Sequence, residues 1–228
     1  MRLGFGVRTT MFDARSFLTP LIAVVFALPL AAADREPLTR AQALTAIEDS
    51  KADVRRTAVE RLGEVGTMDD AERLVARLRD DDPRVRELAT QALWEIWGRS
   101  GDPAVDALYR RGIGQMATGQ LVAALETYSD IVQRKPSFAE GWNKRATIYF
   151  LLGQFELSMK DCDEVLRLNP NHFGALSGVA QMHVLLGQPQ QAIEYFERAL
   201  KVNPNLEGAA QALVLLKRQL EQRRGRSI

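Results

Sequence analysis

The residues with the greatest capacity for chemistry in the second half of the chain are two histidines and one cysteine. Zinc sites usually need three or four Cys or His ligands at short, regular spacing. His172, His183 and Cys162 do not have that spacing. We therefore predict no metal site, a space-filling role for His183, and a buried structural thiol rather than a nucleophile at Cys162.

The densest group of carboxylates is Asp80, Asp81 and Asp82, directly before Pro83. A calcium loop needs alternating oxygen ligands and a distal glutamate, and this run has neither. Acidic residues before a helix start interact well with the positive end of the helix dipole, so we expect a structural role for the run.

Motifs that carry catalysis or hold a cofactor are absent from the sequence. The chain has no haem attachment motif, no glycine-rich phosphate loop and no strand-turn-helix nucleophile motif. We predict that the protein is not an enzyme, has no catalytic residue, and takes neither a cofactor nor a small-molecule substrate.

The composition is that of a folded protein with balanced charge. The 228 residues are 46% hydrophobic and 26% charged, and the formal net charge is +1. A nucleic-acid partner would require a basic stripe, but the only basic cluster is at the C-terminus. We predict no nucleic-acid partner, and we interpret residues 222–228 as a disordered, basic tail.

The N-terminal segment reads as a secretory signal peptide. Arg2, Arg8 and Arg15 precede the apolar run Phe17–Leu30, which small residues follow up to Ala33. The run is shorter than the roughly 20 residues of a membrane-spanning helix. We predict cleavage of residues 1–33 and a periplasmic or secreted location. Retention of the segment as a membrane anchor is the alternative, and it alone would give the protein a membrane partner.

The remainder of the chain predicts helices throughout, because apolar residues recur at spacings of three and four. The second half repeats every 34 residues. Proline recurs at positions 136, 170 and 204, and glycine at 119, 153 and 187. Proline stops a helix, and glycine supplies the positive φ of a tight turn. Each period therefore predicts one helix-turn-helix unit.

These units resemble the tetratricopeptide repeat (TPR) family. The middle unit carries the resemblance best, with Trp142, Ala146, Tyr149, Gly153, Ser158 and Pro170 in the signature positions, although Arg145 replaces a leucine and Cys162 an aromatic residue. The resemblance implies three TPR units within residues 101–221. A last helix, over about residues 206–221, would cap them.

The first half has a different repeat, with a period of 31 residues. "VRRTAVERLGEV" begins at Val54 and "VRELATQALWEI" begins at Val85. An acidic turn followed by Val-Arg and a helix rich in small residues resembles the HEAT family. Two such units lie within residues 34–100. The resemblance implies that Arg55 and Arg86 pair with the acidic turns of neighbouring units.

Both repeats are stacked helix pairs, so the sequence predicts an all-α, right-handed α-solenoid. Two HEAT-like repeats are expected to stack on three TPR units and the capping helix. We expect the two arrays to share one continuous core, with Trp94 and Trp97 near the junction.

The TPR resemblance implies that the first helix of each unit lines a concave face. This face would bind a peptide or a partner helix. The residues that the family pattern assigns to it are Tyr109, Ile113, Met116, Asn143, Lys144, Thr147, Phe150, Ser177, Gln181 and Val184. We therefore expect an exported, non-catalytic adaptor or scaffold for a protein partner. The alternatives are an accessory subunit of an envelope enzyme and a membrane-tethered assembly factor.

Overall fold

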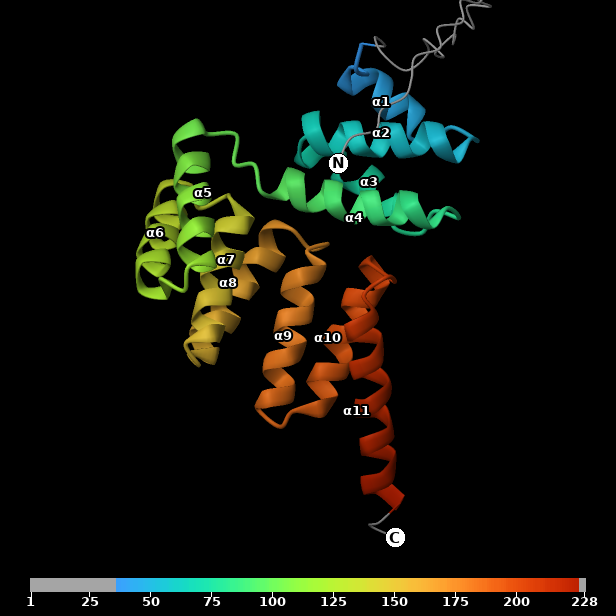
Figure 1. Cartoon of the computed structure of the whole chain (residues 1–228). Helices are drawn as coiled ribbons and strands as arrows, with labels where there is room; N and C mark the ends of the chain where they lie inside the picture. The colour runs from blue at the N-terminus through green and yellow to red at the C-terminus, as the bar shows by residue number, and fades with distance from the viewer. Residues whose placement is uncertain (1–35, 226–228) are drawn as a thin grey trace, which may run out of the picture. The chain divides into compact units, whose positions relative to one another are not determined.

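The computed structural model describes residues 36–225, and every regular element in that range is a helix (Figure 1). This confirms the prediction of an all-α solenoid. The predicted signal peptide and residues 226–228 lie outside the described range. No helix within it is both long and apolar enough to cross a membrane.

The HEAT-like segment consists of two helix pairs. The first pair is α1 (Arg40–Ala46) and α2 (Ala52–Val65). The second is α3 (Ala71–Arg77), preceded by the short 3-10 helix η1 (Met68–Asp70), and α4 (Pro83–Trp97). The longer helices α2 and α4 pack against each other, and α1 and α3 pack on them.

The TPR segment consists of three helix hairpins and a last helix. The hairpins are α5 (Pro103–Ala117) with α6 (Leu121–Arg134), α7 (Ala139–Leu151) with α8 (Phe155–Leu168), and α9 (Phe173–Leu185) with α10 (Pro189–Val202). The last helix, α11 (Glu207–Gly225), packs on α10. It runs past residue 221, so residues 222–225 of the predicted tail are helical.

The repeated glycines and prolines have the conformations that their positions predict. Gly119, Gly153 and Gly187 close the three hairpin turns with φ of 73°, 72° and 69°. The second helix of each unit ends two residues before its proline, as α8 does at Leu168. The residue between lies outside the helical region, because proline disfavours that region for the residue before it.

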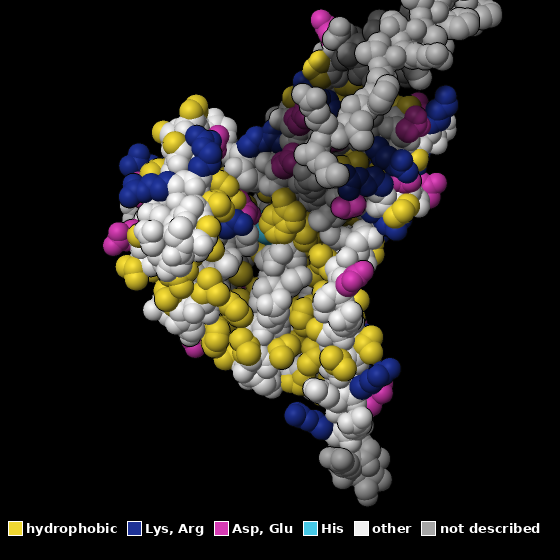
Figure 2. Space-filling view, viewed as in Figure 1, with side chains coloured by type: hydrophobic (Ala, Val, Ile, Leu, Met, Phe, Trp, Pro, Cys, Tyr) yellow, Lys and Arg dark blue, Asp and Glu magenta, His cyan; other side chains and the backbone are white. Residues whose placement is uncertain are grey.

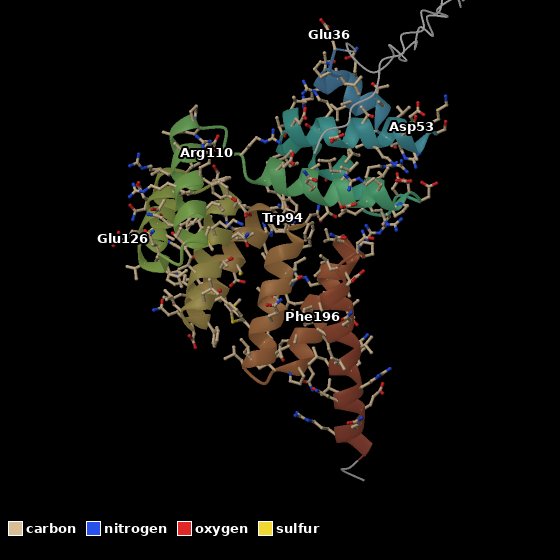
Figure 3. All side chains as sticks on the ribbon, in the orientation of Figure 1. Glu36, Asp53, Trp94, Arg110, Glu126 and Phe196 are labelled. Atoms are coloured by element: carbon tan, nitrogen blue, oxygen red, sulfur yellow. The ribbon has the colours of Figure 1, made fainter. Side chains whose placement is uncertain are left out.

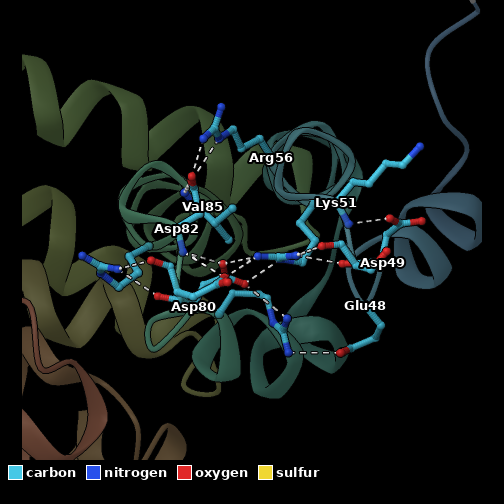
Figure 4. Close-up of polar contacts among 12 residues, drawn as sticks. Glu48, Asp49, Lys51, Arg56, Asp80, Asp82 and Val85 are labelled. Carbon is cyan, nitrogen blue, oxygen red and sulfur yellow. Dashed lines mark hydrogen bonds and ion pairs between the residues drawn. The ribbon is translucent and has the colours of Figure 1, made fainter.

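Within the HEAT-like segment, Arg55 joins one unit to the next through Asp80, which Figure 4 labels in the acidic turn. Its guanidinium donates to the carbonyls of Asp49 and Ser50 in its own turn. It also donates to both oxygens of Asp80, at 2.8 and 2.6 Å, and to Asp81. Asp82 caps α4 by accepting the Val85 N–H at 2.9 Å. The run of three aspartates therefore has two structural roles: Asp82 caps α4, and Asp80 and Asp81 form ion pairs with Arg55.

Arg86 repeats this pattern one unit later, but its second partner belongs to the TPR segment. It donates to the carbonyls of Asp80 and Asp81 in its own turn and to Asn205 Oδ1 at 3.1 Å. Asn205 also donates to the Leu78 carbonyl at 2.8 Å. The Asn-Pro-Asn loop between α10 and α11 thus stands where the acidic turn of a next HEAT unit would stand.

The HEAT core takes in residues of the TPR segment, but the TPR hairpins form separate hydrophobic clusters rather than the one continuous core expected. The two segments meet sideways rather than end to end. Phe173 is buried within the HEAT core, and Val202 and Leu206 pack against it. Phe173 begins α9, Val202 ends α10 and Leu206 precedes α11, so the three lie at or beside the loops that join TPR hairpins. Figure 1 shows α4 running across the ends of α9 and α11. Trp94 and Trp97 lie at this junction, since both rings contact His172 and Phe173.

Candidate functional site

A cavity of about 260 Å³ opens between the first helices of the second and third TPR units. We call it the α7–α9 groove. Its lining residues come from α7, α8 and α9: Asn143, Ala146, Thr147, Phe150, Leu151, Ser158, Cys162, Gly174, Ala175, Gly178, Gln181 and Met182.

The groove exists because α9 carries small residues on the side that faces α7. A Cβ atom added at Gly178 would have no heavy atom within 4 Å, so this position opens onto free space. Apolar groups line the depth of the groove, including the buried side chain of Met182 and the half-buried ring of Phe150. Thr147 and Gln181 are exposed and supply hydroxyl and amide groups. An apolar side chain of a bound peptide fits this arrangement.

The structure brings together four of the ten residues that the family pattern assigns to the concave face, namely Asn143, Thr147, Phe150 and Gln181. Ser177 is half-buried on the same helix as Gln181. Val184 is 41% exposed near the end of that helix and lines a smaller hollow against α11.

The three assigned residues of the first unit lie elsewhere. Ile113 is 41% exposed on α5. Met116 packs against the core of the first unit. Tyr109 is half-buried, with its ring edge-on to Tyr128 and Phe138. Met116 and Tyr109 are therefore engaged within the chain.

Beside the groove lies a buried polar network centred on Glu140, at the start of α7. Glu140 Oε1 lies 2.9 Å from Lys144 Nζ, and Oε2 accepts from Asn143 Nδ2 at 3.0 Å. The Tyr109 hydroxyl donates to Oε1 at 3.3 Å. Burial raises the pKa of Tyr109, so this hydroxyl stays a donor. Asn143 thus serves both the network and the groove, whereas Lys144 belongs to the network and does not line the groove.

His172 completes the network from the loop before α9. Its Nδ1 accepts the backbone N–H of Ala175 at 3.0 Å and so caps α9. A ring nitrogen that accepts carries no hydrogen, so in the neutral ring the hydrogen is on Nε2. This nitrogen donates to Glu140 Oε2 at 2.9 Å.

The pKa of Glu140 reports the balance within this network. Burial alone would raise the pKa of the carboxyl, but the hydrogen bond from His172 and the charge of Lys144 outweigh it. The pKa falls from 4.5 to about 2, so the group is a carboxylate at neutral pH.

Trp94 connects the network to α4 (Figure 3). Lys144 Nζ lies 5.8 Å from the centroid of the Trp94 ring, within the range of a cation–π contact. The ring is edge-on to His172 and Phe173. A Cβ at Gly174 would lie 2.6 Å from Trp94 Cη2, so only glycine permits this approach.

Sequence reasoning missed the roles of His172 and Glu140, although a signal for His172 is present. Phe138, His172 and Leu206 occupy equivalent positions 34 residues apart. The other two are apolar, so a histidine in this series is expected to be buried and to require a polar partner. Glu140 has no such signal, because an acidic residue in a first helical turn is ordinary on an exposed surface.

The residues first considered for chemistry have structural surroundings. Cys162 is 4% exposed, and burial raises the pKa of its thiol to about 12, so it is not a reactive thiolate. His183 is buried, with Nδ1 2.6 Å from Gln188 Oε1 and its ring against Tyr195. Among residues 36–225, no group of three or more His, Cys, Asp or Glu is arranged to hold a metal ion.

Comparison with protein families identifies both kinds of repeat. Residues 21–94 match the model of HEAT repeats, and residues 139–172 and 175–206 match the model of the tetratricopeptide repeat. The α5–α6 hairpin lies outside the matched residues. It nevertheless has the same positive-φ glycine turn as the two hairpins that match.

Individual relatives resemble parts of the chain. A TPR repeat-containing protein of Rhizobium etli is 32% identical over 85 residues, which cover 37% of this chain and 41% of that protein. The chain thus matches about two fifths of the length of that relative.

Two solved structures resemble the TPR segment. The Sgt2 TPR domain of Aspergillus fumigatus has a TM-score of 0.50 at 22% identity, covering 54% of this chain and 83% of that domain. The first TPR domain of Spaghetti (RPAP3), bound to the HSP90 peptide SRMEEVD, has a TM-score of 0.49 at 24% identity, covering 51% and 93%. Likeness at these identities concerns the fold alone. Both models match within one chain, so the chain carries HEAT repeats in its first half and tetratricopeptide repeats in its second half.

Proposed function

We propose that the protein is an exported, non-catalytic adaptor that holds a peptide or a partner helix in the α7–α9 groove. The observation that carries the proposal is the cavity of about 260 Å³, whose depth is apolar and whose edge carries polar groups. A pocket of this kind takes an apolar anchor side chain and fixes its backbone by hydrogen bonds.

The surface around the groove supports this function. Figure 2 shows hydrophobic side chains gathered over the lower parts of α7 to α11. Exposed apolar residues on these helices and their turns include Leu151, Leu157, Leu185 and Leu215, at 55%, 45%, 59% and 58% exposure. A patch of exposed apolar side chains usually marks a surface that binds a partner.

Export is the part of the proposal that depends on the sequence alone. The basic flank, the apolar run and the small residues up to Ala33 support it. N-terminal sequencing of the protein recovered from its native compartment is expected to begin at Asp34. A protein recovered with an intact first residue would contradict cleavage and favour the anchored form.

Gly178→Leu tests the groove, because the new side chain enters free space and occupies the cavity. Peptides are first selected against the wild-type protein from a random display library, and their affinities are then measured by fluorescence polarisation. We expect Gly178→Leu to weaken them by about tenfold or more, since a buried anchor contributes at least about 2 kcal/mol.

Gly114→Leu is the matched control. Gly114 is also an interior helix glycine with free space around its Cβ position, but it lies on α5, outside the groove. Its peptide affinities are expected to equal those of the wild type. Peptides that bind Gly178→Leu as tightly as the wild type would place the binding site elsewhere.

A further inference from the structure

A second cavity, of about 160 Å³, lies where the HEAT-like and TPR segments meet, away from the α7–α9 groove. It is lined by the end of α4 and the residues after it, by the α6–α7 loop and by the end of α8. We call it the junction cavity. Among its lining residues, Trp97, Arg99, Lys135, Ser137 and Asn169 carry polar groups that bear on its chemistry.

Two buried donors of this lining have no hydrogen-bond partner among residues 36–225. They are the indole Nε1 of Trp97, a residue 3% exposed, and the amide Nδ2 of Asn169, a residue 6% exposed. A buried donor without an acceptor costs about 1–3 kcal/mol. Two of them on one cavity indicate that an acceptor belongs there.

The internal repeat provides a comparison for Asn169. Asn203 is the equivalent residue one unit later, and it too is buried. Its Nδ2 reaches the hydroxyl of Thr90 on α4, at 3.5 Å. Both asparagines use Oδ1 to accept the N–H two residues ahead. The two asparagines therefore differ at the amide NH₂ group. That of Asn203 has Thr90 as its partner, whereas that of Asn169 has none and belongs to a residue that lines the junction cavity.

The charges around the cavity indicate the sign of the missing acceptor. Lys135 and Arg99 contribute two cations, and the lining contains no Asp or Glu. The guanidinium of Arg99 donates to the backbone carbonyls of Gly63, Glu64 and Glu95, so those contacts leave its charge unneutralised. Ser100 also lines the cavity, and its hydroxyl donates to the carboxylate of Asp106 at 2.6 Å.

The start of α7 contributes backbone donors, and the carboxylate of Glu140 in the same turn is taken up by its own partners Lys144, Asn143, Tyr109 and His172. Ala139, the first residue of the helix, lines the cavity, and its N-cap residue Phe138 supplies no side-chain hydrogen bond. The first N–H groups of a helix have no partner inside the helix, and they carry the positive end of its dipole.

We propose that the junction cavity binds a small oxyanion, a phosphate, sulfate or carboxylate group, between the HEAT-like and TPR segments. The Trp97 indole and the Asn169 amide donate to its oxygens, Lys135 and Arg99 balance its charge, and the Ser137 hydroxyl lies at its edge. The site does not share lining residues with the α7–α9 groove, so it stands or falls independently of the adaptor function.

The test observes the indole N–H of Trp97 by ¹H–¹⁵N NMR on the full chain. The chain has three tryptophans and therefore three indole N–H signals. Trp94→Phe and Trp142→Phe each remove one of them, and the signal that remains in both variants belongs to Trp97. Sodium phosphate, sodium sulfate and sodium acetate are titrated separately, with sodium chloride holding the ionic strength constant. We expect a saturable shift of the Trp97 signal with at least one of the three oxyanions.

Lys135→Gln removes a cation from the edge of the cavity without disturbing the core, because Lys135 is half-buried in a loop. It should weaken binding by about tenfold, the effect of losing one charge-assisted hydrogen bond. Lys160→Gln is the matched control. It removes the same charge from an exposed position on α8, outside the cavity, and should leave the affinity unchanged.

The outcomes separate the sources of the anion. Saturation by phosphate or sulfate indicates a tetrahedral anion, and saturation by acetate alone indicates a carboxylate. A shift that fails to saturate with all three salts, or that is equal in Lys135→Gln and the wild type, would overturn the proposal and leave water as the acceptor.

Discussion

At the scale of single residues, the hydrogen bonds of Glu140 decide the character of the junction. Glu140 is 2% exposed. Its carboxylate forms an ion pair with Lys144 and accepts hydrogen bonds from Asn143, Tyr109 and His172. A buried charge is tolerable only when it is paired and its lone pairs are satisfied. Glu140 meets both conditions, with partners from α5, α7 and the loop before α9.

Glu140→Gln is expected to reduce the dependence of stability on acid pH. The folded-state pKa is about 2, below the value of about 4.3 for an unfolded chain. The carboxylate therefore stabilises the fold above the unfolded pKa, and this contribution is lost as the pH falls through the folded pKa. The shift corresponds to a contribution on the order of 3 kcal/mol.

Urea unfolding at several pH values between about 6 and 2 measures this contribution. The wild type should lose more free energy of unfolding over this window than Glu140→Gln does. The aspartates of the HEAT-like segment are the same in both proteins, so the difference reports Glu140 together with its partner His172. Parallel curves for the two proteins would show that the carboxylate pKa is not lowered by folding.

At the scale of elements, the departure from the TPR pattern at Arg145 is compensated by the neighbouring helix α8. Arg145, where TPR units are expected to have leucine, forms two hydrogen bonds with Asp161 of α8, at 2.7 and 2.8 Å. Its guanidinium also lies 4.8 Å from the centroid of the Trp142 ring. A bidentate pair combined with a cation–π contact replaces the apolar contact that leucine would make.

The HEAT arginines provide a prediction at the same scale, because Arg55 and Arg86 occupy equivalent positions with unequal partners. Arg55 binds two carboxylates, and its side chain is 7% exposed. Arg86 binds a neutral amide as its second partner. Removing Arg55 takes the closest cation from the buried carboxylate of Asp80, whose pKa the guanidinium holds below its usual value despite burial. Asp80 then keeps only Arg77, at 3.3 Å, and the N–H of Asp82, at 3.0 Å.

Arg55→Ala is therefore expected to lower the urea midpoint clearly more than Arg86→Ala does. Circular dichroism at neutral pH follows both transitions. Equal midpoints for the two variants would show that the acidic turn adds nothing beyond a neutral partner.

At the scale of the whole described segment, the HEAT-like segment packs against the loops that join the TPR hairpins. Arg79 donates to the carbonyls of Lys201 and Val202, and Arg86 and Thr90 contact the asparagines of the same loop. Trp94 and Trp97 cover the preceding loop. The repeated Asn-Pro-Asn turns thus end TPR helices and also receive α4.

Gly174→Ala tests this coupling, because the added methyl group would overlap the Trp94 ring. We expect it to destabilise the protein by about 1–3 kcal/mol, as overpacking of a close contact does. Gly178→Ala, one turn along the same helix and facing free space, should instead be neutral or stabilise by up to about 1 kcal/mol. Urea unfolding measures the free energy of unfolding of the two variants. Equal values would mean that the Trp94 ring of α4 is not in close contact with Gly174 of α9.

The sequence by itself determined the helices, their punctuation and the two repeat types. Periodic apolar residues, the glycines of the turns and the prolines after α6, α8 and α10 act locally, within a few residues of their own position. The resemblance to the TPR family assigned Asn143, Thr147, Phe150 and Gln181 to one face, and the structure finds them around one groove.

Only the tertiary structure decided how the two arrays meet and what their loops contact. The residues that meet at the junction are about 30 to 80 positions apart in the sequence. They include Glu140 with His172, Trp94 with Gly174, and the unpartnered donors of Trp97 and Asn169 on one cavity. Such contacts depend on packing between units, where many side chains contribute small energies together, and no local pattern encodes that sum.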